Sequence, residues 1–131
     1  MTEEYLVLDA SAVVDLLLGE AVGAAVHRRI DGVALHAPAH LDAEVLSGLG
    51  RLQRAGRLAD SAVSRQLAVL AEAPIVRHGL EELLVGAWER RHRLRLADGL
   101  YVELAHRLGT QVLTTDHALG RAATNAEVVT A

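Results

Sequence analysis

Short apolar runs alternate with helical segments along this chain, and this alternation constrains its fold more than any other feature. The run Tyr5–Leu8 is apolar on both faces and ends at Asp9, as expected for a strand inside a parallel sheet. The other predicted strands are Val33–His36, Ile75–Val76, Gln111–Thr114 and, at an edge, Glu127–Val129. Strands separated by helices form right-handed βαβ units. The sequence therefore predicts an α/β fold, with a twisted parallel sheet of four or five strands between helices on both faces.

The segments between the strands have helical periodicity. Apolar residues recur from Leu41 at spacings of four, four and three, which indicates one face of a helix that ends at Gly56. Gly109 is the expected C-cap of the helix Leu96–Leu108, because glycine readily adopts the left-handed conformation. The other predicted helices are Ser11–Leu18, Ala21–Arg29, Ser61–Ala71, Leu80–Arg91 (with Glu81, Glu82 and Glu89 facing out) and a short one from His117.

Composition excludes several kinds of chemistry. The 131 residues contain no cysteine, which excludes disulfide frameworks, cysteine zinc sites and thiol catalysis. They contain no lysine, which excludes Schiff-base and P-loop chemistry. The net charge of -4 argues against nucleic-acid binding through overall charge alone.

Length and hydropathy indicate one domain over residues 1–131 and no membrane span. Charged residues interrupt every apolar stretch well short of the ~18 residues that a span needs. The N-terminus, Met1–Glu4, is acidic where a signal peptide would be basic. We therefore expect a cytoplasmic protein.

Four acidic residues stand where predicted strands end or predicted helices begin: Asp9, Glu44, Asp98 and Asp116. Ligands of open parallel sheets bind beyond the carboxyl ends of the strands, so these acids can converge on one rim if the strands before Asp9 and Asp116 are neighbours. Grouped carboxylates repel one another unless a cation lies among them. Without histidine or cysteine partners they suit Mg²⁺ or Mn²⁺, which can activate water and hold a phosphate for displacement.

Each of these acids also has a purely structural explanation. Asp9 and Asp116 are good N-caps for the helices that follow them, and for each residue taken singly the capping role is favoured. Glu44 can interact with the positive end of its helix, and Asp98 can be an N-cap or a first-turn acid. Asp42 is expected to cap that same helix or to lie in its first turn, pointing away from Glu44.

Competing sites are weaker. His36 and His40 have Pro38 between them, so they cannot form a helical i, i+4 metal pair, and most of the seven histidines are expected at the surface or half-buried. Arginines form two clusters, each as consistent with a solvated face as with phosphate or partner binding. The clusters are Arg51, Arg54 and Arg57, and Arg90, Arg91, Arg93 and Arg95.

Four blocks of sequence follow one another in a fixed order over nearly the whole chain. They are Tyr5–Leu17, Pro38–Leu46, Leu96–Ala105 and Val112–Ala122. Together they resemble the blocks of PIN-domain ribonucleases of the VapC toxin type. The resemblance implies a PIN-like three-layer fold and a Mg²⁺- or Mn²⁺-dependent endoribonuclease, the toxin of a toxin–antitoxin pair. Its RNA products would carry 5′-phosphate and 3′-hydroxyl ends.

The resemblance also implies roles for particular residues and partners. It implies RNA as the substrate, a small cognate antitoxin of the VapB type as the inhibitor, and a homodimer. Ser11 matches a hydroxyl beside the first acid, and Thr115 is a weaker candidate of the same kind. The family's metal-binding acids correspond to Asp9, Glu44, Asp98 and Asp116, while Arg51, Arg54 and Arg57 are candidate RNA or partner contacts.

Two other functions stay open. A catalytically silent PIN-type module would bind a partner or a transcript without cleaving it. A receiver or haloacid-dehalogenase-like phosphoryl-transfer domain also has an aspartate after its first strand, but receivers need a lysine. The phosphatases use a second aspartate two residues later, where this chain has Ser11.

Overall fold

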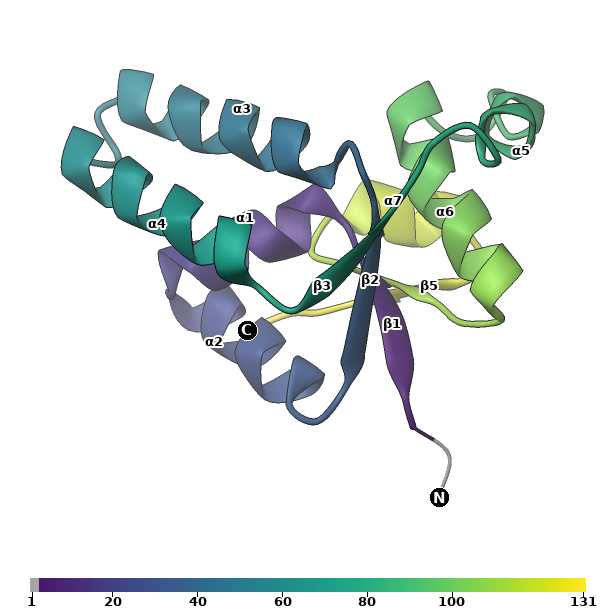
Figure 1. The fold of residues 1–131 in the computed structure, drawn as a ribbon, viewed down its shortest axis with the longest axis horizontal. Coiled ribbons are helices and arrows are strands. Elements are labelled where there is room, and N and C mark those ends of the chain that lie inside the picture. Colours follow the sequence, from purple (N-terminus) through teal and green to yellow (C-terminus); the bar gives the residue numbers. More distant parts are fainter. Residues whose placement is uncertain (1–2) are drawn as a thin grey trace.

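The computed structural model describes residues 3–131, and a five-stranded sheet lies at its centre (Figure 1). The strands are β1 (Tyr5–Leu8), β2 (Ala34–Pro38), β3 (Ile75–His78), β4 (Val112–Thr114) and β5 (Ala126–Val128). They lie in the order β3-β2-β1-β4-β5, and every neighbouring pair is parallel. The predicted α/β fold is confirmed, with β5 at an edge as expected. Met1 and Thr2 of the acidic N-terminus lie outside the described residues.

Helices cover both faces of the sheet. They are α1 (Ala10–Leu18), α2 (Ala21–Ile30), α3 (Leu41–Arg54), α4 (Asp60–Glu72), α5 (Leu84–Glu89), α6 (Leu96–Leu108) and α7 (His117–Ala122). The chain moves outward from β1 through β2 to β3, and then returns past β1 to β4. Because such connections are right-handed, this reversal puts α5 and α6 on the face opposite α1 to α4 (Figure 1).

The core is aliphatic, as the composition requires. The three residues Leu6–Leu8 are at most 2% exposed, because β1 has a strand on each side and helices on both faces. Tyr101 is the largest fully buried side chain, at 1% exposure. It lies on α6, which contacts both β1 and β2. An aromatic residue therefore sits directly under the carboxyl ends of the central strands.

Most predicted boundaries differ from the observed ones by one or two residues, and the C-cap at Gly109 is confirmed by its φ of 68°. The prediction of one helix over Leu80–Arg91 is wrong, because only Leu84–Glu89 is helical and turns flank it. No side chain caps the start of α5, and both Leu83 and Leu94 turn into the core. The helix therefore begins four residues later and ends two residues earlier than the periodicity predicts. The three glutamates expected to face out are exposed.

Within residues 3–131, no single helix has the length and apolar character to cross a membrane. The bent pair α1 and α2 meets those two criteria only when taken together.

Candidate active site

The candidate site lies where the chain reverses direction across the sheet. β1 pairs directly with β4, and the backbone N–H of Asp9 donates to the carbonyl of Leu113 at 3.2 Å. The carboxyl ends of these two strands therefore share the crevice in which open α/β sheets bind ligands. A cavity of about 700 Å³ opens there, and all four predicted acids line it: Asp9, Glu44, Asp98 and Asp116.

Asp9 is the most buried of the four acids, at 4% exposure. It caps α1 by accepting from the Ala12 N–H at 3.0 Å, and it accepts from the hydroxyls of Ser11 at 2.8 Å and Thr114 at 2.5 Å. Burial raises the pKa of Asp9 to about 6, against the effect of these hydrogen bonds, and the charge of Asp98 raises it further. The predicted cap is confirmed, and the same geometry fixes the carboxylate at the cavity wall.

Hydroxyl groups connect Asp9 to the end of β4. Ser11 Oγ accepts from the Thr115 N–H at 3.1 Å and lies 3.1 Å from Thr114 Oγ1. The Thr115 hydroxyl donates instead to Asp15, at 2.6 Å. Thr114 was missed in the sequence, although a polar residue closing a fully buried strand was an available signal.

A buried tyrosine holds Glu44. The Tyr101 hydroxyl donates to Glu44 Oε1 at 2.6 Å, and burial together with this carboxylate raises the pKa of the phenol well above its usual range. The His40 ring packs on Tyr101 with 4.6 Å between centroids, and its Nε2 lies 3.1 Å from the Ala97 carbonyl. Sequence reasoning missed both residues, although Tyr101 follows Asp98 by one helical turn.

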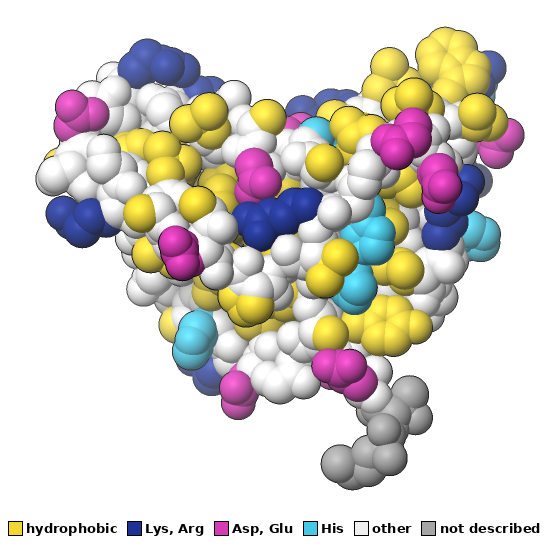
Figure 2. All heavy atoms as spheres, viewed as in Figure 1, with side chains coloured by type: hydrophobic (Ala, Val, Ile, Leu, Met, Phe, Trp, Pro, Cys, Tyr) yellow, Lys and Arg dark blue, Asp and Glu magenta, His cyan; other side chains and the backbone are white. Residues whose placement is uncertain are grey.

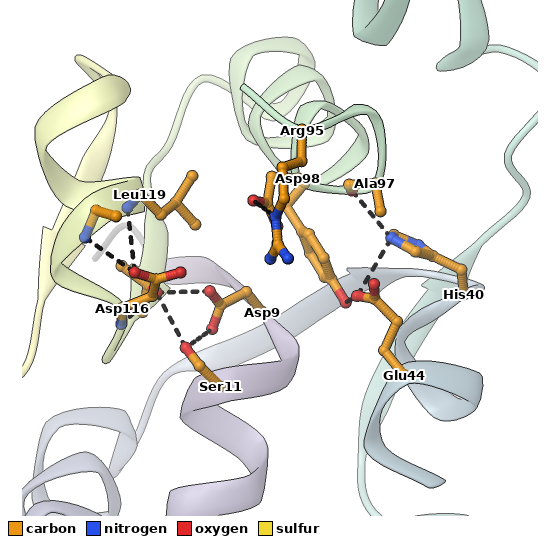
Figure 3. Close-up of polar contacts among 12 residues, drawn as sticks. Asp9, Ser11, His40, Glu44, Arg95, Ala97, Asp98, Asp116 and Leu119 are labelled. Atoms are coloured by element: carbon orange, nitrogen blue, oxygen red, sulfur yellow. Dashed lines mark hydrogen bonds and ion pairs between the residues drawn. The ribbon is translucent and has the colours of Figure 1, made fainter. Parts of the chain in front are cut away.

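The remaining two acids lie at the starts of helices (Figure 3). Asp116 is the N-cap of α7, as predicted, and accepts from the N–H groups of Ala118 at 2.9 Å and Leu119 at 3.4 Å. Asp98 lies in the first turn of α6 and is not its N-cap. Its Oδ2 accepts from Arg95 Nε at 3.0 Å.

The donor set suits a hard divalent cation, because it consists of carboxylate oxygens. Among residues 3–131, however, no group of three acidic or histidine side chains stands ready to hold an ion. One oxygen of Glu44 accepts from Tyr101, whereas both oxygens of Asp98 face the Arg95 guanidinium. A cation that binds these Asp98 oxygens therefore competes with Arg95.

Comparison with known proteins identifies the family. The PIN domain family matches residues 6–125. Over 127 residues the chain is 53% identical to Ribonuclease VapC3 of Mycobacterium tuberculosis, covering 96% of this chain and 93% of the relative. The chain belongs to the VapC type of PIN-domain ribonuclease toxins. Ribonuclease VapC12 of the same organism is 36% identical over 124 residues, covering 94% of this chain and 96% of the relative.

Solved structures have the same fold. M. tuberculosis VapC20, described as a sarcin–ricin loop cleaving toxin, has a TM-score of 0.72 at 18% identity, covering 95% of this chain and 99% of that one. A toxin–antitoxin complex from Klebsiella pneumoniae has a TM-score of 0.67 at 12% identity, with coverages of 94% and 96%. The PIN domain match and the identity to Ribonuclease VapC3 confirm the predicted endoribonuclease toxin, and the phosphoryl-transfer alternative is set aside.

The arginine clusters of this VapC-type protein divide by position. Arg51 and Arg95 line the cavity, whereas Arg54 and Arg57 are exposed outside it. Arg90 pairs with Glu103, and Arg91 lies over the Trp88 ring at 4.4 Å.

Two further expectations concern Asp42 and the histidines. Asp42 lies in the first turn of α3, as expected, and pairs with Arg77 at 3.0 Å. All seven histidines are exposed or half-buried, as predicted, and His36 contacts His78 of β3, with 2.9 Å between ring nitrogens.

Proposed function

We propose that this VapC-type endoribonuclease hydrolyses RNA with Mg²⁺ or Mn²⁺ held by Asp9, Glu44, Asp98 and Asp116. One observation carries the proposal: these acids come from four separate parts of the chain and line one cavity at the carboxyl ends of β1 and β4. VapC ribonucleases are generally dependent on a divalent metal. When bound, the ion supplies a water molecule of lowered pKa and offsets the charge of the phosphate under attack.

The surrounding residues position the acids for this reaction. Ser11 and Thr114 orient the Asp9 carboxylate, and Tyr101 orients Glu44 through its hydroxyl. The N–H groups at the start of α7 fix the orientation of the Asp116 carboxylate. Thr115 acts through Asp15, so we give it a supporting role only.

We assign partners by the same reasoning. The substrate is RNA, and a VapB-type antitoxin is the cognate inhibitor, as the toxin–antitoxin complex of similar fold suggests. Arg51 at the cavity is the strongest RNA contact of its cluster, and Arg54 and Arg57 extend that basic surface along and beyond α3. We further propose that residues 1–131 form one PIN domain, that it acts as a homodimer, and that it works in the cytoplasm with its RNA and antitoxin.

The test replaces Asp98 with asparagine, which keeps the side-chain shape and removes the charge. We expect Asp98→Asn to lose Mn²⁺-dependent RNA cleavage by about 10²-fold or more, with the far-UV circular dichroism of the wild type. Asp60→Asn is the matched control, because Asp60 is an exposed first-turn acid of α4 outside the cavity. Cleavage at the wild-type rate by Asp98→Asn would refute the site. Failure of the wild type itself to cleave any RNA would favour the silent binding module.

A further inference from the structure

Arg95 extends from the start of α6 into the acidic cavity (Figure 3). Its Nε lies 3.0 Å from Asp98 Oδ2 and its Nη2 lies 3.5 Å from Asp98 Oδ1, so one guanidinium spans both carboxylate oxygens. The charges of Asp116 and Glu44 also act on Arg95. A positive group of this chain thus stands among the acids, where a cation relieves their repulsion.

The ion pair between Arg95 and Asp98 is easily separated. The Arg95 side chain is 80% exposed, whereas that of Asp98 is 15% exposed. Exposed ion pairs contribute little to stability because water solvates the separated charges well. The residue precedes α6 without capping it through its side chain, so its release leaves the helix intact.

Two other arginines of the chain, Arg77 and Arg29, are held by more contacts than Arg95. Arg77 bonds Asp42 and three backbone carbonyls, and Arg29 bridges Glu4 and Glu127. Arg95 is bonded to Asp98 alone among the described residues, and Asp98 is an acid assigned above to the metal. A divalent ion and Arg95 therefore compete for the same oxygens.

We propose that Arg95 is a displaceable internal cation: it holds Asp98 in the metal-free protein and, once a metal takes that acid, it binds a phosphate of the RNA. The inference rests on the proposed function above. The planar guanidinium suits phosphate as well as carboxylate, because both present two oxygens to its fork. Once released from Asp98, the Arg95 guanidinium offsets the negative charge of one RNA phosphate at the cavity. Metal loading and RNA binding are then linked through one side chain.

The first measurement is Mn²⁺ binding without RNA, by isothermal titration calorimetry. We expect Arg95→Gln to bind Mn²⁺ about two- to fivefold more tightly than the wild type, the range that an exposed ion pair supplies. Arg95→Lys keeps the competing charge and is expected to bind Mn²⁺ as the wild type does. Unchanged or weaker binding by Arg95→Gln, or tighter binding by Arg95→Lys, overturns the inference.

The second measurement is the KM for RNA at saturating Mn²⁺. We expect Arg95→Gln to raise this KM about tenfold through loss of a charge-assisted contact. Arg65→Gln removes an exposed arginine of α4 outside the cavity and serves as the control. An Arg95→Gln KM equal to that of the control rejects the phosphate contact.

Asp98→Asn separates this inference from the proposed function. If Asp98→Asn binds Mn²⁺ as tightly as the wild type, the metal site itself is wrong. If Asp98→Asn loses Mn²⁺ while Arg95→Gln matches the wild type, only the role of Arg95 is wrong.

Discussion

Asp9 illustrates how one residue can serve the fold and the site in opposite ways. Its three hydrogen bonds fix the start of α1, yet its charge is buried at 4% exposure among other acids. Because burial outweighs the hydrogen bonds, its pKa rises from 3.8 to about 6. Folding therefore disfavours the ionised carboxylate, which is the form that the proposed metal binding needs. The residue has the character of a functional group more than of a structural one.

Replacing Asp9 with asparagine is expected to stabilise the metal-free protein at pH 8 and to abolish cleavage. A raised folded-state pKa means that the contribution of Asp9 is fully present below pH 4 and is lost as the pH rises through about 6. A rise of the pKa from 3.8 to about 6 corresponds to a loss of at most about 3 kcal/mol in the free energy of unfolding once Asp9 is ionised. Urea unfolding in EDTA at pH 4 and pH 8 measures the effect.

The wild type should lose stability between those pH values relative to Asp9→Asn. Asp31→Asn is the control, because Asp31 is exposed. Parallel pH profiles for the wild type and Asp9→Asn would contradict the assignment of a costly buried charge to this residue.

At the scale of elements, α2 packs closely against α1, the helix that Asp9 caps. α1 and α2 meet at a bend of 112°, and α2 begins two residues after Gly19 ends α1. A Cβ placed on Gly23 would overlap the carbonyl oxygen of Asp15 in α1. The backbones of the two helices are in close contact there, so a shift of α2 toward α1 would displace α1.

Gly23→Ala is therefore expected to lower the free energy of unfolding by about 2 kcal/mol or more, as overpacking against backbone does. Gly50→Ala in α3 is the matched control, because its Cβ would make only an ordinary 3.6 Å contact with Arg54. That control should gain up to about 1 kcal/mol from helix propensity. Chemical denaturation of both variants measures the difference, and equal stabilities would show that the α1–α2 contact is looser than described.

At the scale of the whole molecule, the sheet topology concentrates negative charge at one point. Four acids from four distant segments line one cavity in a chain of net charge -4. Arg51 and Arg95 also line it, so the rim of the candidate site is locally mixed in charge although the total is negative. Overall charge is thus a poor guide to the binding of RNA by this protein.

Mn²⁺ is accordingly expected to raise the melting temperature of the wild type. An ion at 100 times its Kd adds about 2.7 kcal/mol to the folded state. Asp98→Asn should show a much smaller rise, since it lacks one of the acids that we propose to hold the metal. Calorimetric melting with and without Mn²⁺ gives the comparison, with Ca²⁺ as a reference ion. Equal rises for both proteins would mean that the ion binds elsewhere.

The sequence alone determined the elements, the family and the position of each acid along the chain. Apolar periodicity is a local property, so it predicted the strands and the C-cap at Gly109 closely. N-capping is equally local, which is why the capping roles of Asp9 and Asp116 were predictable. The short α5 was not, because burial of Leu83 and Leu94 overrides the periodicity there.

Only the tertiary structure decided which groups meet. The pairing of β1 with β4 brings Thr114 to Asp9 across 105 residues, and the packing of α6 brings Tyr101 to Glu44 across 57. Arg95 pairs with Asp98 only three residues further along the chain. The role we infer for this pair nevertheless depends on Glu44 and Asp116, which only the fold brings near it. Contacts between distant residues depend on how whole elements pack, and no short stretch of sequence carries that information.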